Sequence, residues 1–356
     1  IRSIIGVRDP PEGSLISFLC APGFSDLRLR SQNIRRTVNI MNASYEKPRS
    51  VEVSSTLSSL ESSDLSGYQS DQEHHLTVSG KVLRIVVAVA MMFACALTPS
   101  LLIQIPAIRS FGVAHSHPQS NVDDVVMAAL VLLLYGTATI LVLMLCYVLR
   151  RTLDRGRRVS LNLRLDRRAL LWAVGMFLVA VAVNLAVAGI VHALGLAGGN
   201  EGMPNRPWWF IVAAIFSQAF FLQGIPEEII WRGWLFSSLG ETRFAAVSSV
   251  LGFTVLHLLS QGGQQNLFEH LTYLALPCGF AVTALIVRMI SGSTWAAIGV
   301  HGGIHVANDV LSDRLHLPSG SITWVLQGLL WAAVGLLILA FHRRRQRLAA
   351  LTDRTC

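Results

Sequence analysis

Two carboxylates and an arginine interrupt an apolar stretch between residues 208 and 239. Glu227, Glu228 and Arg232 stand there among Phe, Trp, Ile and Leu. On a helix, Glu228 and Arg232 lie four residues apart with the acid first, the order that favours an ion pair. Glu227 is rotated by about 100° from Glu228 at 3.6 residues per turn, so it can face a different neighbour. The spacing predicts that Glu228 and Arg232 hold structure while Glu227 is left for proton transfer.

Three histidines occur in two later apolar stretches. His257 ends the run Phe-Thr-Val-Leu-His, and His301 begins a third polar motif that contains His305 and Asn308. Positions 301, 305 and 308 recur at i, i+4 and i+7, which places them on one face of a helix. The two glycines that follow His301 remove side chains and permit a close helix approach. This face is a second candidate for chemistry.

These motifs can meet at similar depths in a membrane. At about 1.5 Å rise per residue, Glu227 lies roughly 18 Å from one end of its segment, and the corresponding depths are about 20 Å for His257 and 10 Å for His301. Taken singly, each motif could be a packing residue or an ion pair near a helix end. Together they favour a site, because ionisable groups inside membrane segments are costly without a function or a partner. A positioned carboxylate with a histidine neighbour can act as a general base on water.

The composition requires membrane helices to position these residues. The 356 residues are 52% hydrophobic and only 14% charged, whereas soluble domains contain about 25% charged residues. This composition excludes a soluble enzyme, a disordered regulator and a disulfide-stapled domain. We predict an all-α, polytopic membrane protein with about eight transmembrane helices, at residues 85–108, 125–149, 169–196, 208–239, 244–260, 267–290, 294–311 and 322–341.

Arginines set the expected orientation. They cluster at residues 150–168 and 343–347 within a chain of net charge +8, and short basic loops stay in the cytoplasm. Eight crossings place both clusters on one side, so we expect a multi-pass protein of the cell membrane with both termini cytoplasmic. The expected partners are membrane lipid and a peptide or protein substrate that reaches the site from the cytoplasmic side, with no nucleic acid.

Four regions follow from the distribution of polar residues. Residues 1–80 contain a Ser-rich stretch and are expected to form a disordered cytoplasmic tail, within which Met41 is a candidate initiator. Residues 81–168 add two transmembrane helices and the basic loop, residues 169–341 form the core with all three motifs, and residues 342–356 form a basic cytoplasmic tail.

The ordered motifs Glu227-Glu228-x-x-x-Arg232, Phe253-x-x-x-His257 and the His301-centred segment resemble the CPBP intramembrane proteases. This family includes the type II CAAX prenyl endopeptidases and the bacteriocin-processing and self-immunity proteins. The resemblance covers residues 169–341 and implies a CAAX-protease-like helical bundle.

The family also implies roles for individual residues. By resemblance, Glu227 and His257 activate the water that attacks the scissile amide, while His301 and position 305 hold the oxyanion. The family usually has Asn at that last position, and this chain has His305. Histidine can donate a hydrogen bond as Asn does, and Asn308, one turn later, could also substitute.

The sequence leaves one alternative open for metal dependence and others for function. No cofactor is required for a glutamate-and-water mechanism, but Glu227, His257 and His301 could bind zinc, because carboxylate and imidazole are zinc ligands. The leading hypothesis is a membrane-embedded endopeptidase. The alternative is a non-proteolytic membrane scaffold or immunity protein with the same fold. A proton-coupled transporter fits less well, since no repeated half is visible.

Overall fold

The computed structural model describes residues 76–116, 120–196, 198, 206–260, 262–314, 318 and 320–352, and all of them belong to one compact unit. Within these ranges the regular structure is entirely helical. The expected disordered tail lies outside the described residues up to position 75, and its last residues are helical from Val78 onward.

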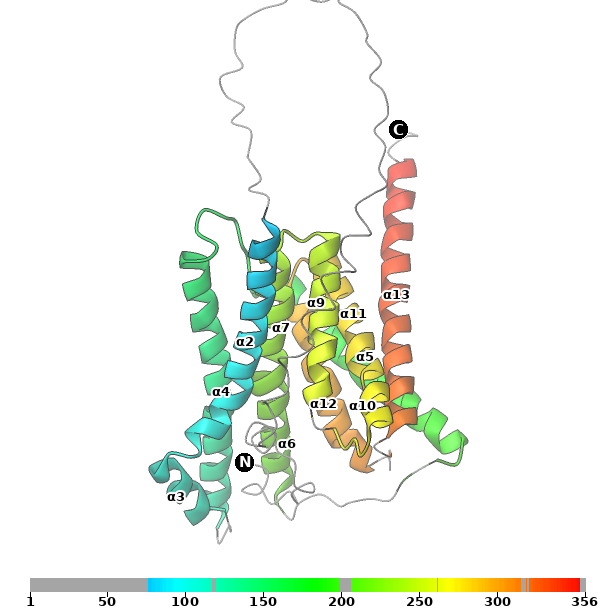
Figure 1. The fold of residues 1–356 in the computed structure, drawn as a ribbon. Helices are drawn as coiled ribbons and strands as arrows, with labels where there is room; N and C mark the ends of the chain where they lie inside the picture. Colours follow the sequence, from blue (N-terminus) through cyan, green and yellow to red (C-terminus); the bar gives the residue numbers. More distant parts are fainter. Residues whose placement is uncertain are drawn as a thin grey trace, which may run out of the picture. The chain divides into compact units, whose positions relative to one another are not determined.

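The elements follow one another along the chain as alternating crossings of a bundle (Figure 1). They are α2 (Val78–Leu102), α3 (Pro106–Ala114), α4 (Asn121–Arg151), α5 (Arg167–Ala193), α6 (Trp208–Phe216), η3 (Ser217–Gly224), α7 (Ile225–Glu228), η4 (Ile229–Leu235), α8 (Phe236–Ser238), α9 (Arg243–Leu256), η5 (His257–Leu259), α10 (Leu267–Tyr273), α11 (Ala275–Ser291), α12 (Thr294–Arg314) and α13 (Ser321–Thr352).

Each of the eight predicted segments is helical, and the chain is a multi-pass membrane protein. Six helical stretches in the described part are long and apolar enough to cross a membrane: Val78–Leu102, Asn121–Arg151, Arg167–Ala193, Trp208–Ser238, Leu267–Ser291 and Ser321–Leu351. The apolar helix Arg243–Leu259 is shorter. The seventh predicted segment, α12, carries the polar third motif, which lowers its hydropathy.

Helix boundaries differ from the prediction in two places. The first segment was expected to be continuous over residues 85–108, but α2 ends at Leu102 and a separate helix, α3, begins at Pro106. Proline is favoured at the first position of a helix, where its missing N–H costs nothing, so Pro106 begins a helix better than it continues one. At the other end of the chain, α13 extends through the arginines to Thr352.

The arginine clusters lie at one end of the bundle. Figure 1 shows the start of α2, the loop between α4 and α5 and the last turns of α13 at the same end. We call this the arginine-rich end, defined by residues 150–168 and 343–347. The described residues of the connection between α9 and α10, 260 and 262–266, lie at the opposite end. The chain therefore crosses the bundle an even number of times between the two arginine clusters, as expected if both clusters lie on one side of the membrane.

The α4–α5 loop, residues 152–166, is fastened to the core by its only buried carboxylate. Asp154 is 1% exposed. Its Oδ1 lies 2.7 Å from the Arg84 guanidinium of α2, and its Oδ2 accepts a 2.8 Å hydrogen bond from Trp234 Nε1 of η4. Both carboxylate oxygens are thus satisfied by groups from two different helices, which fixes the loop on the bundle.

Further bonds extend this attachment to the start of α12 and the end of α8. The Thr294 hydroxyl donates to Leu161 O at 2.7 Å, and Arg157 donates to Ser238 O at 3.1 Å. Burial and the positive charge of Arg84 lower the pKa of Arg157, although the Asp154 carboxylate acts in the opposite direction. The loop therefore covers the arginine-rich end of the core.

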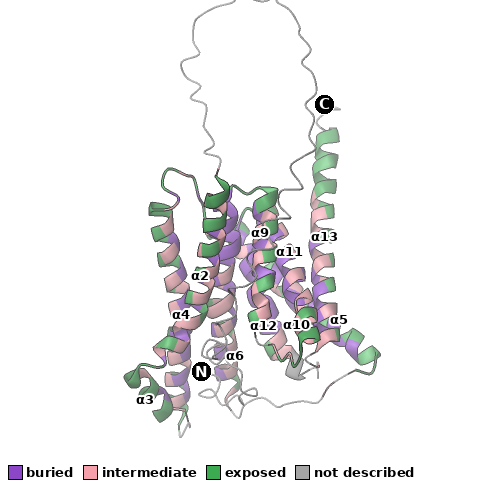
Figure 2. Cartoon of the chain, viewed as in Figure 1, coloured by how far each residue is buried: buried purple, intermediate pink, exposed green. Residues whose placement is uncertain are grey.

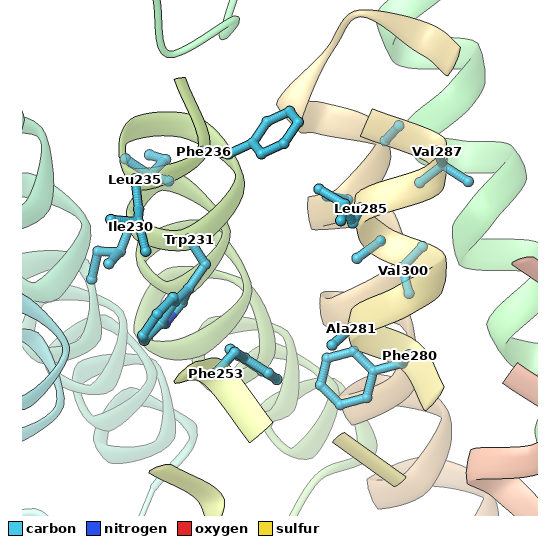
Figure 3. Close-up of a cluster of buried hydrophobic side chains, with 14 of the residues drawn as sticks. Ile230, Trp231, Leu235, Phe236, Phe253, Phe280, Ala281, Leu285, Val287 and Val300 are labelled. Atoms are coloured by element: carbon cyan, nitrogen blue, oxygen red, sulfur yellow. The ribbon is translucent and has the colours of Figure 1, made fainter. Parts of the chain in front are cut away.

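Beneath the loop, large side chains fill the space between η4 and α11. Trp231, Phe236 and Phe253 are at most 1% exposed. Figure 3 shows Phe253 between Trp231 and Phe280, with the Trp231 ring turned away from α11. Edge-on packing of Phe253 against Trp231 and Phe280, with ring centroids 6.2 and 5.3 Å apart, is the favoured geometry for aromatic pairs. The helix with the first motif is consequently held rigidly against its neighbours.

Candidate active site

The helix that carries the first motif is irregular on both sides of the carboxylates. The short α-helical segment α7 contains Pro226, Glu227 and Glu228 and is flanked by the π-helical segments η3 and η4. π-Helical turns inside longer helices are rare and occur frequently at functional sites. Sequence spacing gave no sign of these wider turns, but the i, i+4 ion pair forms across one of them.

Glu228 is the fully buried centre of an ion-pair network. Its Oε1 lies 3.0 Å from Arg232 Nη1 and 2.8 Å from His301 Nδ1, and the Glu228 and Arg232 side chains are both 0% exposed. Arg232 also donates to Ala281 O at 3.3 Å and stacks 4.5 Å above the Phe253 ring. The predicted ion pair is present, and it ties the first motif to α11 and to the third motif on α12.

Glu227 is left without such bonds. Its Oε2 has no hydrogen-bond partner among the described residues, and it lies 3.8 Å from His301 Nε2. The side chain keeps 13% of its surface exposed, whereas that of Glu228 keeps none. Glu228 Oε2 likewise has no hydrogen-bond partner among the described residues. The two adjacent carboxylates therefore differ in that Glu228 is fully buried and bonded through Oε1 to Arg232 and His301, whereas Glu227 has no such bond and is partly exposed.

Hydrogen bonding fixes the tautomer of His301. A carboxylate oxygen only accepts hydrogen bonds, so the contact with Glu228 Oε1 requires a proton on Nδ1 of His301. The Nε2 of a neutral His301 is then an acceptor, and it lies 3.1 Å from Nε2 of His305. In this state His305 donates its Nε2–H to His301. The two histidines of the third motif form a chain that begins at Glu228.

His257 joins the cluster from the end of α9. Its Nδ1 donates to Phe253 O at 2.9 Å, which leaves Nε2 of the neutral ring as an acceptor. Its ring packs on Phe253 at 4.5 Å between centroids, and His301 packs on the same phenyl ring at 5.7 Å. His257 is also within range of electrostatic interaction with His301 and His305. The structure thus brings the second and third motifs together around Phe253.

Asn308 has a different neighbour. Its Oδ1 accepts a 2.7 Å hydrogen bond from Gln327 on α13, which also donates to Asn184 of α5 at 2.9 Å. Asn184 and Gln327 are buried. Asn308 lies on the predicted face of α12, but its carbonyl is bonded to this inter-helix network. Position 305 is the one in direct contact with His301.

Close packing of glycines sets the distance between the first and third motifs. A Cβ atom on Gly224 would lie 2.8 Å from Ala219 O and 3.1 Å from the backbone nitrogen of Gly302. Only residues without side chains fit here, as expected for the small residues at interfaces between membrane helices. Gly224 is three residues before Glu227, and Gly302 directly follows His301. The prediction that glycines permit close helix approach is confirmed.

Sequence reasoning missed three polar residues of this region. The ring centroid of Tyr273, at the end of α10, lies 6.5 Å from that of His257. Gln327 and Asn184 form the network described above. Each of them could have been found as a single polar residue within an apolar segment, because uncharged polar groups buried in membrane helices also need hydrogen-bond partners.

The sequence left zinc binding by Glu227, His257 and His301 open as an alternative to a mechanism without a cofactor. Within the described part of the chain, no three His, Cys, Asp or Glu side chains are grouped in a way that could hold a metal ion. Glu227, His257 and His301 are therefore treated below as groups that bind and move protons.

The fold and the site together define a polytopic helical membrane protein with a carboxylate–histidine cluster inside its bundle. Residues 204–307 match the model of a protein family described as type II CAAX prenyl endopeptidase Rce1-like. This segment contains all three motifs up to His305, and the match confirms the resemblance to the CPBP proteases. The matched family is a protease family, which supports a hydrolase. No curated protein and no solved structure gives a significant match.

Proposed function

We propose that this protein is an intramembrane endopeptidase that hydrolyses a peptide bond with a water activated by Glu227 and His257. The observation that carries the proposal is the contrast between the two adjacent glutamates. Glu228 is fully buried and bonded through Oε1 to Arg232 and His301, whereas Glu227 has no such bond and lies partly exposed beside His301. A free carboxylate next to imidazoles is suited to general acid–base catalysis.

The proposed reaction begins when Glu227 takes a proton from water. The oxygen of that water bonds to the carbonyl carbon of the scissile amide, and the carbonyl becomes an oxyanion. His257 assists through Nε2, which is free to accept because Nδ1 is bonded to Phe253 O. Glu227 then gives its proton to the amide nitrogen, the C–N bond breaks, and an amine and a carboxylic acid leave.

His301 and His305 are the proposed oxyanion donors. In the neutral tautomers described above, the Nδ1–H of His301 is bonded to Glu228 and the Nε2–H of His305 to His301, so donation requires His305 to turn its Nε2–H from His301 to the oxyanion, or His301 to be protonated on Nε2. A donor held in a site of low dielectric stabilises developing charge strongly. Glu228 and Arg232 act as positioning residues in this proposal. Asn308, which is bonded to Gln327, is the less direct candidate for the same role.

For orientation, we propose that the arginine-rich end faces the cytoplasm, as short basic loops do. Both arginine clusters lie at this one end, so a single orientation satisfies them together. The termini would then be cytoplasmic.

The test compares protein termini in the membrane proteome of cells that carry the wild type, Glu227→Gln or His257→Ala. Termini that appear only with the wild type, and that vanish in both variants, are expected. Glu269→Gln, a carboxylate of the same chain outside the three motifs, is the matched control and should retain them. Identical termini in all four strains, at equal protein abundance, would favour the scaffold or immunity alternative.

A further inference from the structure

The two ends of the bundle differ in how completely they enclose the site. Toward the arginine-rich end, residues 228–239 of the first-motif helix are all buried, and so are residues 296–304 of α12. Both buried runs stop at the cluster. Glu227 and His305, which lie on the far side of Glu228 and His301, are partly exposed. Figure 2 shows that buried residues gather inside the bundle, while exposed ones lie on its outer faces and at the helix ends. Beyond the cluster, buried residues such as Pro226, Val306 and Ala307 alternate with partly exposed ones, so the continuous burial ends at the site.

Specific contacts close the arginine-rich end of the bundle over the site. The α4–α5 loop lies across this end and is held there by the hydrogen bonds of Asp154 and Leu161. Glu241 adds to these contacts, since its Oε1 lies 3.1 Å from Arg288 Nη2 and accepts a 2.9 Å hydrogen bond from Ser237. A peptide that entered from this end would have to displace the loop and the buried ion pairs beneath it.

Toward the opposite end, polar residues lead away from the site. His257 is 14 residues from the start of α9 at Arg243, or about 21 Å at helical rise, but only three residues from Ser260. The Ser260 hydroxyl donates to His257 O at 2.8 Å. The connection that follows Ser260 is Gln-Gly-Gly-Gln-Gln-Asn. Tyr273, whose ring centroid lies 6.5 Å from that of His257, and His257 thus join this hydrophilic connection to the cluster around Phe253.

We infer that the substrate peptide reaches Glu227 from the end of the bundle formed by the α9–α10 connection, opposite the arginine-rich end. This inference rests on the proposed function. An extended peptide has backbone groups that need hydrogen-bond partners or water, and accessible polar side chains lead to the site from this end. The route differs from the cytoplasmic route expected from the sequence if the arginine-rich end is cytoplasmic. The substrate would then be a peptide segment on the non-cytoplasmic side of the membrane.

Site-directed labelling of the full chain in sealed vesicles tests the route. In a background in which all five cysteines are replaced by alanine, single cysteines are introduced and treated with a membrane-impermeant methanethiosulfonate. Arg155→Cys marks the arginine-rich end, and Gln265→Cys marks the α9–α10 connection; both positions are exposed. The probes of the site are His257→Cys and, with His257 retained, Ser260→Cys.

Both probes are expected to react from the side that labels Gln265→Cys, at least tenfold faster than from the side that labels Arg155→Cys. Ser238→Cys, which is fully buried beneath the loop, is the matched control and should react from neither side. Reaction of His257→Cys from the Arg155→Cys side, or from neither side, would overturn the inference. Reaction of Ser238→Cys as fast as that of Arg155→Cys would also overturn the inference.

The labelling pattern does not require cleavage. If the pattern is found but the termini described above do not depend on Glu227, the route stands and the peptidase proposal fails. If those termini depend on Glu227 but the pattern is reversed, the peptidase proposal stands and the route fails. The two proposals are therefore separable.

Discussion

The Nδ1 atom of His301 lies 2.8 Å from Oε1 of Glu228, an oxygen that Arg232 also contacts at 3.0 Å. This bond joins the first and third motifs, which are 73 residues apart in the chain. It also fixes the proton on Nδ1 and so turns Nε2 toward Glu227 and His305. Glu228 thereby determines which nitrogen of His301 faces Glu227.

The two glutamates should respond oppositely to amidation. Glu228→Gln leaves the Arg232 charge buried without its counter-ion, and breaking a buried pair in this way costs about 3 kcal/mol or more. Glu227→Gln removes no hydrogen bond found in the described structure and replaces a carboxylate that is costly to bury. Thermal unfolding of purified protein in detergent should show a clear loss of Tm for Glu228→Gln and none for Glu227→Gln.

Activity should separate the same two variants in another way. Glu227→Gln should lower kcat by about 10²-fold or more, as expected for loss of a general base, while the protein remains folded. Equal loss of Tm in both variants would contradict the division of roles, because it would mean that Glu227 also supports the fold.

Position 305 should tolerate the residue that is usual in the family. His305→Asn keeps a hydrogen-bond donor beside His301, so activity should stay within about tenfold of the wild type. His305→Ala removes the donor, and loss of one oxyanion donor costs about 10²- to 10³-fold in kcat. Steady-state rates on an identified substrate measure both effects. Equal inactivity of the two variants would show that position 305 needs an imidazole.

Much of the fold could be predicted because the motifs stand out against apolar helices. Eight helical segments, the Glu228–Arg232 pair and the close approach at Gly302 all follow from local spacing, which membrane helices preserve. The break between Leu102 and Pro106 could have been anticipated from the proline, but the high hydropathy on both sides concealed it.

Features that depend on contacts between distant segments could not be predicted. The bond between Glu228 and His301, the role of Gln327 as the partner of Asn308, and the packing of the α4–α5 loop over the core all arise between helices. Spacing within one segment carries no information about which neighbour a side chain meets. The basic loop was therefore predicted only by its charge, whereas the structure shows it as a cover.

Gly224→Ala should separate Glu227 from His301 without removing any polar group. The added Cβ would lie 2.8 Å from Ala219 O and 3.1 Å from Gly302 N, which are backbone atoms that cannot move alone. Overpacking of this kind costs about 1–3 kcal/mol, and the shift of α12 should lower kcat by at least tenfold. Gly175→Ala on α5 is the matched control, because a Cβ there meets nothing within 4 Å. Similar activity of the two variants would mean that the helix contact is not what positions His301.

Asp154→Ala should loosen the cover at the arginine-rich end. The substitution leaves the Arg84 guanidinium, which is 3% exposed, and Trp234 Nε1 without their shared acceptor. An uncompensated buried charge of this kind costs about 3–5 kcal/mol, so Tm should fall strongly. Asp166→Ala is the control: it removes only the side-chain cap on Ala169 N of α5, worth about 1 kcal/mol. Hydrogen exchange should also rise in residues 152–166 and at the start of α12 in the Asp154 variant alone. Unchanged exchange there, with Tm lowered equally in both variants, would show that Asp154 contributes general stability and does not hold the loop on the core.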